Sequence, residues 1–110
     1  MKKIIIAILT LLLAVSGSLF AQGKYGKDSA ECLKYLSYYR EYYKQKAYDD
    51  ALPNWRKAYK LCPPTANQTM LIDGTSLMRR LIAANSNNPV YREALIDSLL
   101  TIHRVRAQAW

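Results

Sequence analysis

Residues 32–63 read CLKYLSYYREYYKQKAYDDALPNWRKAYKLCP, a segment that holds the chain's only two cysteines. Apolar residues recur in each half at steps of three and four, which is the spacing of one face of an α-helix. In the first half they are Leu33, Leu36, Tyr39 and Tyr43, and in the second half Ala51, Leu52, Trp55, Ala58, Tyr59 and Cys62. The segment therefore predicts two helices joined by a short turn, a hairpin over residues 30–62.

Pro53 leaves the start of the second helix open. Proline is tolerated in a first turn but disrupts a helix interior, so this helix starts either near Asp50 or near Ala47 with a kink at Pro53. Its end is expected at Cys62, because two prolines follow and the residue before a proline avoids helical geometry.

The remaining sequence predicts a second hairpin over residues 66–107. Thr65 or Asn67 can cap a third helix that runs to about residue 84, and the sequence NSNNP at residues 85–89 indicates a loop. Gly74 lies inside this helix, where glycine costs about 1 kcal/mol relative to alanine. The expected fold class is all-α, with four helices in antiparallel hairpins.

The fourth helix is expected over about residues 90–107. Its apolar residues are Leu95, Ile96, Leu99, Leu100, Ile102 and Val105. These positions cover two faces of a helix, and only one face can pack on the third helix. The other face needs a partner from outside the chain.

The first 21 residues have the order of parts of a secretory signal peptide, with a basic start, an apolar run and a small-residue exit. We predict cleavage after Ala21, a flexible lead-in over residues 22–28 and one domain over residues 29–110. The alternative is an uncleaved anchor. The apolar run of about a dozen residues is shorter than the roughly 20 that a spanning helix needs, so no stable membrane span is expected after cleavage.

The mature chain is expected to be basic without being a nucleic-acid binder. Removing the signal peptide leaves 14 Lys and Arg against 8 Asp and Glu, a net charge of +6. The basic residues are scattered along all the helices, and no run is longer than Arg79-Arg80. This pattern indicates a solvated surface rather than a basic patch for nucleic acid.

The two cysteines of an exported chain are consistent with a single disulfide, and the alternatives are a metal pair or two free thiols. A metal site is disfavoured, because the chain has only one histidine, His103, far from both cysteines. His103 also has no predictable carboxylate or thiol partner. We expect no metal, no cofactor and no catalytic activity.

Residues 32–65 resemble one tetratricopeptide repeat, with Cys32 at the first position of the 34-residue unit. The residues that carry the resemblance are Tyr35, Tyr38, Tyr42, Tyr48, Ala51, Trp55, Ala58 and Pro63. Tyr39 departs from the pattern, since the family usually has a small residue there. One unit later the pattern fails, with Thr69, Ile72 and Asp73 at the key positions.

The resemblance implies that the start of the first helix lies beside the end of the second, so that Cys32 and Cys62 form a disulfide. Repeats of this family bury their apolar faces on neighbouring units. The chain is therefore expected to continue into further repeats, or to bind another chain through the fourth helix. The residues expected at that contact are Leu95, Leu99 and Ile102.

The family's inner surface is lined by first helices, which here would expose part of Leu36, Arg40, Tyr43 and Lys44. An aromatic ring between two cations suits an acidic peptide or a stacked sugar. Together with the signal peptide and the paired cysteines, the resemblance implies a non-catalytic scaffold for protein–protein interaction in the periplasm or cell envelope of a bacterium. The alternative is a glycan-binding module that uses exposed tyrosines.

Overall fold

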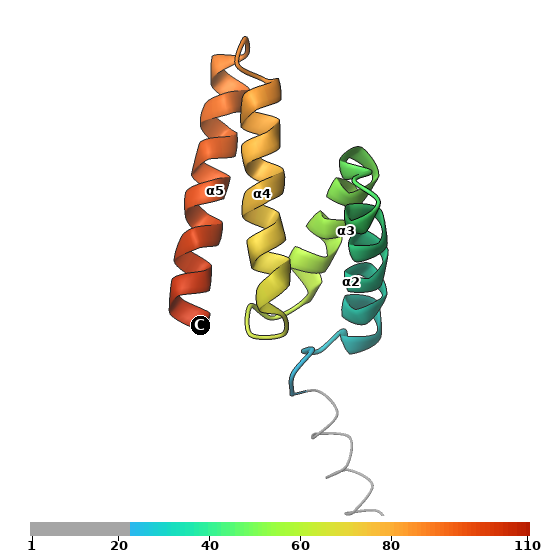
Figure 1. Cartoon of the computed structure of the whole chain (residues 1–110). Coiled ribbons are helices and arrows are strands. Elements are labelled where there is room, and N and C mark those ends of the chain that lie inside the picture. The colour runs from blue at the N-terminus through green and yellow to red at the C-terminus, as the bar shows by residue number, and fades with distance from the viewer. Residues whose placement is uncertain (1–22) are drawn as a thin grey trace, which may run out of the picture.

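The structure is a computed structural model that describes residues 23–110, and its helices form two antiparallel hairpins (Figure 1). Helices α2 (Ser29–Lys44) and α3 (Tyr48–Leu61) make the first hairpin, and α4 (Gln68–Ala84) and α5 (Pro89–Ala109) make the second. The all-α prediction is confirmed for the described residues. The predicted signal peptide, with its cleavage point after Ala21, lies outside them.

The two hairpins meet at one end and diverge toward the other (Figure 1). They are joined by the short connection between α3 and α4, and the C-terminus lies near this joined end. There the Trp110 Nε1 donates to the Pro64 carbonyl oxygen at 3.0 Å, which ties the end of α5 to the connection. The closed end of the domain is therefore fixed by both the chain and a side-chain contact.

Helix α2 is followed by a left-handed residue, Lys46, with φ of 60°. The Lys46 and Ala47 amides donate to the carbonyls of Tyr43 and Tyr42, each at 3.0 Å, which satisfies the last turn of α2. The chain then reverses in three residues and enters α3 at Tyr48. Of the two starts considered for this helix, the structure has the early one, and α3 runs through Pro53.

Side-chain caps define where the second hairpin begins and turns. The Asn67 Oδ1 accepts from the Met70 amide at 3.0 Å, so Asn67 rather than Thr65 caps α4. The Asn88 Oδ1 accepts from the Tyr91 amide at 3.3 Å, and Pro89 occupies the first position of α5. The starts of α4 and α5 are therefore both set by a capping asparagine.

The buried face of α2 is made by Cys32, Leu36 and Tyr39. Tyr38 and Tyr42, which the repeat pattern places among the packing residues, are instead 49% and 39% exposed. At about 100° per residue, their stripe is rotated by about a quarter turn from the buried one. Since only one stripe can face α3 and α4, these two tyrosines point away from the core.

Helix α3 buries the small and aromatic residues expected of it. Ala51 and Ala58 are fully buried, and Trp55 is 3% exposed. Alanine at these two positions allows α2 and α3 to approach closely, since it carries only a methyl group. Tyr35, Tyr48 and Tyr59 are half-buried against this core.

The disulfide between Cys32 and Cys62 is present and joins the start of α2 to the end of α3, with their Cα atoms 5.0 Å apart. Both cysteines are buried. The expected flexible lead-in is partly docked beside them: Tyr25 packs against the core, and Gly26, with φ of 77°, leaves no room for a side chain next to Pro63. This end of the hairpin is therefore closed by both a covalent bond and packing.

The residues of α5 that were expected to contact another chain are buried within this chain. Leu95 and Ile102 are 3% and 2% exposed, and Leu99 is half-buried, all within the core. The choice of these residues for a contact with another chain is wrong, because they form the face of α5 that packs on α4. The exposed apolar residues of α5 are Val90, Tyr91 and Leu100.

Within residues 23–110, no helix is both long enough and apolar enough to cross a lipid bilayer.

Replacing both cysteines, in the variant Cys32→Ser/Cys62→Ser, should destabilise the protein by roughly 3 to 4 kcal/mol on the chain-entropy estimate for a cross-link of this span. The bond joins residues 30 positions apart, so its loss frees a long loop in the unfolded state. Urea unfolding followed by circular dichroism measures the change. The wild-type protein in reductant is the control and should match the variant; unchanged unfolding in both would contradict the structural role.

Candidate functional site

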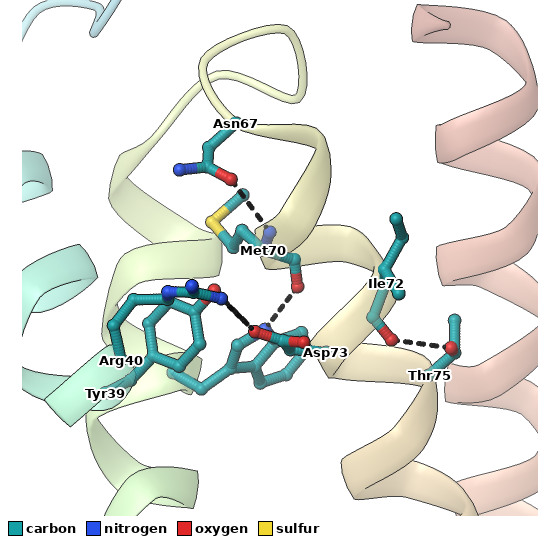
Figure 2. A network of polar contacts seen from close by, with 8 residues as sticks. Tyr39, Arg40, Asn67, Met70, Ile72, Asp73 and Thr75 are labelled. Carbon is teal, nitrogen blue, oxygen red and sulfur yellow. Dashed lines mark hydrogen bonds and ion pairs between the residues drawn. The ribbon is translucent and has the colours of Figure 1, made fainter. Parts of the chain in front are cut away.

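The two hairpins are joined by a buried carboxylate on α4. Asp73 is 6% exposed, and its Oδ2 accepts from the Tyr39 hydroxyl at 3.1 Å and from the Arg40 Nη1 at 2.9 Å (Figure 2). Tyr39 and Arg40 are consecutive residues of α2, so the contact connects the first helix of one hairpin to the first helix of the next. A buried charge needs such partners, because an unpaired one is strongly destabilising.

This junction changes the predicted ligand surface. Leu36 is 6% exposed and belongs to the core, so its assignment to that surface is wrong. Arg40 is paired with Asp73 inside the chain, which removes the free charge that an acidic ligand would need. Tyr43 is half-buried, with its ring at 81° to the Tyr48 ring and the two centroids 5.4 Å apart.

Of the four residues, only Lys44 is exposed. The four residues lie on one side of α2, as the helical spacing predicts. That side carries the contact of α2 with α4. A pair of cations around an exposed ring does not form there. The functional surface has to be sought elsewhere.

Burial and the neighbouring carboxylate change the chemistry of Tyr39. Its side chain is fully buried, and burial, followed by the negative charge of Asp73, raises the pKa of the phenol well above its ordinary value. The hydroxyl therefore remains a hydrogen-bond donor to Asp73 throughout the neutral range. Tyr39 acts as a structural donor rather than as an acid or a base.

Trp55 is the second link between the hairpins. Its Nε1 donates to the Met70 carbonyl oxygen at 2.8 Å, and its ring stacks on Tyr59 with centroids 5.0 Å apart. A Cβ at position 74 would overlap the Trp55 ring, with Cε2 at 2.7 Å and Cζ2 closer still. Gly74 is therefore required by the close approach of the indole to the backbone of α4.

A third link lies nearer the open end. The Arg80 guanidinium of α4 sits 3.6 Å from the centroid of the Tyr48 ring, at the start of α3. A cation over an aromatic face is a weak but directional attraction. The tilt between the hairpins is thus held by side chains from the start and the middle of α3.

A groove of about 330 Å³ lies between α3, α4 and α5. Its lining residues are Trp55, Arg56, Tyr59, Met78, Asp97, Ser98, Thr101 and Ile102. The Ser98 and Thr101 hydroxyls bond to the carbonyls of Ala94 and Asp97 on their own helix. The groove therefore offers an aromatic and aliphatic surface with one charge on each of two facing helices.

His103 is exposed, and its Nε2 lies 3.4 Å from the Arg79 Nη2 rather than beside a carboxylate. No group of three or more histidine, cysteine, aspartate or glutamate side chains within residues 23–110 could hold a metal ion. The groove, with its apolar lining, is the candidate functional site.

The sequence contained a signal for the junction that the repeat pattern obscured. Asp73 lies between Leu71 and Leu77 on the apolar face of the expected helix, and a buried carboxylate usually has a hydrogen-bond partner. Its partners stand 33 and 34 positions earlier, one repeat length away. Asp73, which departs from the repeat pattern, is the place where the two hairpins are joined.

Comparison with protein-family models, with curated proteins and with solved structures gives no match to this chain.

The variant Gly74→Ala should destabilise the protein by about 1 to 3 kcal/mol, as expected for overpacking a close contact. Helix propensity alone would predict a gain of about 1 kcal/mol, so the sign separates the two effects. Urea unfolding measures it, with Ser76→Ala in the same helix as the control. A more stable Gly74→Ala protein would show that the indole does not pack on this backbone.

The junction predicts a loss of stability at alkaline pH. The pKa of Tyr39 is raised in the folded state. The stability that its protonated hydroxyl contributes is therefore complete below the ordinary tyrosine pKa near 10.0, and it is lost as pH rises toward the folded-state value. The difference in unfolding free energy between wild type and Tyr39→Phe should be constant from pH 7 to pH 9.5, then shrink. Urea unfolding at 25 °C measures it; a difference that stays constant to pH 11.5 would contradict the burial of the phenol.

Proposed function

We propose that this chain is a non-catalytic binding module, similar to a tetratricopeptide-repeat scaffold, that holds a segment of a protein partner outside the cytoplasm. The observation that carries the proposal is the groove between α3, α4 and α5, walled by the stacked Trp55 and Tyr59. An apolar hollow with a few polar groups at its rim is the usual form of a recognition site.

The size and lining of the groove suit one large apolar side chain of a polypeptide. Trp55, Met78 and Ile102 provide an apolar floor that is already held rigid by the core. Because the hydroxyls of Ser98 and Thr101 are engaged on their own helix, the groove has little to offer a highly polar ligand. A buried apolar anchor with a polar surround is the common arrangement of binding hot spots.

The charges beside the groove favour an acidic segment. Arg56 lines the groove and Lys60 is exposed one turn further along α3, whereas Asp97 is the single acid of the lining. A peptide with acidic residues next to its anchor would be attracted to this edge, and the attraction would weaken with salt. We therefore propose that an acidic partner would bind along α3 rather than on the Arg40 side of α2.

Action outside the cytoplasm is supported by two features. The N-terminal sequence has the order of a signal peptide, and a disulfide closes the first hairpin. Disulfides persist in oxidising compartments and are rare in the cytosol. The non-catalytic part of the proposal is supported by the position of His103, which lies beside Arg79 rather than beside a carboxylate or thiol of residues 23–110.

The experiment is a selection of peptides from a displayed library on the purified, oxidised protein, followed by fluorescence polarisation with the peptides recovered. The blocking variant is Ser98→Trp, which fills the groove from an exposed position, and the matched control is Ser37→Trp on α2. We expect recovered peptides to carry an aromatic or aliphatic anchor among acidic residues. Ser98→Trp should lower the affinity for these peptides by about tenfold or more, equivalent to about 1.4 kcal/mol of binding free energy.

Binding should also weaken between 50 and 500 mM salt, whereas Ser37→Trp should leave it unchanged. Circular dichroism melting of both variants checks that the fold is retained. Recovered peptides that bind Ser98→Trp as tightly as wild type would place the site elsewhere, and a library that yields no binding peptide would count against a peptide-binding role.

A further inference from the structure

A second hollow, of about 430 Å³, lies on the first hairpin between α2 and α3. It is lined by Tyr38, Glu41 and Tyr42 of α2 and by Asn54 of α3. None of these residues lines the groove described above. The hollow therefore belongs to a separate surface that the proposed peptide site does not use.

The two tyrosines of this hollow are exposed without serving the core. Tyr38 and Tyr42 are 49% and 39% exposed, and they stand one helical turn apart, with about 5–6 Å between their Cβ atoms. The Tyr38 ring is oriented by an edge contact with Tyr35, with centroids 6.0 Å apart. Two large rings are thus presented side by side to solvent, in a protein whose other tyrosines mostly pack.

The polar residues of the hollow are held in place and keep free acceptors. The Glu41 Oε1 accepts from the Gln45 Nε2 at 3.1 Å, and the Asn54 Nδ2 donates to the Asp50 carbonyl oxygen at 3.0 Å. Within residues 23–110, the second carboxylate oxygen of Glu41 and the Asn54 Oδ1 take part in no hydrogen bond. Both are acceptors that a ligand hydroxyl can reach.

We propose that this hollow binds a neutral oligosaccharide. A pyranose ring with equatorial hydroxyls has a face of C–H groups that stacks on a tyrosine ring, and its hydroxyls donate to acceptors at the ring edge. The two rings on successive turns suit two consecutive sugar units, so an oligomer binds better than a monomer. This role goes beyond the proposed peptide site and does not depend on it.

Two tyrosines and a carboxylate could also attract a cationic group. The surrounding charges oppose this. The Lys34 and Lys57 ammonium groups lie 4.8 and 5.0 Å from the centroid of the Tyr35 ring, which contacts Tyr38. The chain as a whole carries a net charge of +8. A ligand without positive charge is therefore favoured.

The test is isothermal titration of the purified, oxidised protein with oligosaccharides of glucose and of N-acetylglucosamine, from one to six units. We expect binding that strengthens from one to at least two units. Tyr38→Ala and Tyr42→Ala should each weaken it by about tenfold, since stacking on one ring contributes up to about 1.5 kcal/mol. Tyr91→Ala is the matched control, because Tyr91 on α5 is 38% exposed and lies outside the hollow.

The same titration separates this site from the other possibilities. Ser98→Trp, which blocks the groove, should bind the oligosaccharides as tightly as wild type does. Oligosaccharide binding therefore does not depend on whether the groove binds a peptide. Binding that Tyr91→Ala weakens as much as Tyr42→Ala, no binding to any of the oligosaccharides, or binding of choline in their place would each overturn the proposal.

Discussion

The contact of the Trp55 indole with the backbone of α4 determines how the two hairpins pack against each other. Its Nε1 bonds to the Met70 carbonyl oxygen, and its ring occupies the space that a side chain at Gly74 would fill. The indole thereby brings the second hairpin against the first and at the same time forms a wall of the groove. One side chain sets both the packing of the hairpins and the shape of the candidate site.

A small two-hairpin domain has few apolar contacts between its halves, and it compensates with polar ones. The Asp73 carboxylate accepts from Tyr39 and Arg40, and the Arg80 guanidinium covers the Tyr48 ring. These contacts are directional, so they specify the angle at which α4 leaves α3, which apolar packing alone would leave less defined. Buried polar pairs contribute little net stability unless fully satisfied, and here each has its partners.

The tyrosines illustrate how one residue type serves different ends according to its position around a helix. Tyr39 is buried and bonded to Asp73, Tyr59 is half-buried and stacked on Trp55, and Tyr38 and Tyr42 face solvent. The chemistry of a phenol allows all three, because its ring packs and its hydroxyl tolerates water. The peptide and sugar proposals rest on different members of this set.

The helices, their order and the closure of the first hairpin could be predicted from the amino-acid sequence, because they follow from local periodicity, helix-end signals and two cysteines at matching ends. Asn67 was one of two candidate caps, the loop at residues 85–89 was predicted, and the Cys32–Cys62 pair was expected from the hairpin. Which stripe of α2 faces inward could not be predicted, since the stripes of Leu36 and of Tyr38 are both apolar and differ by about a quarter turn, and the packing of α3 and α4 selects between them. The tertiary structure also decides that Arg40 is bound to Asp73, a contact between residues 33 positions apart that no local pattern contains.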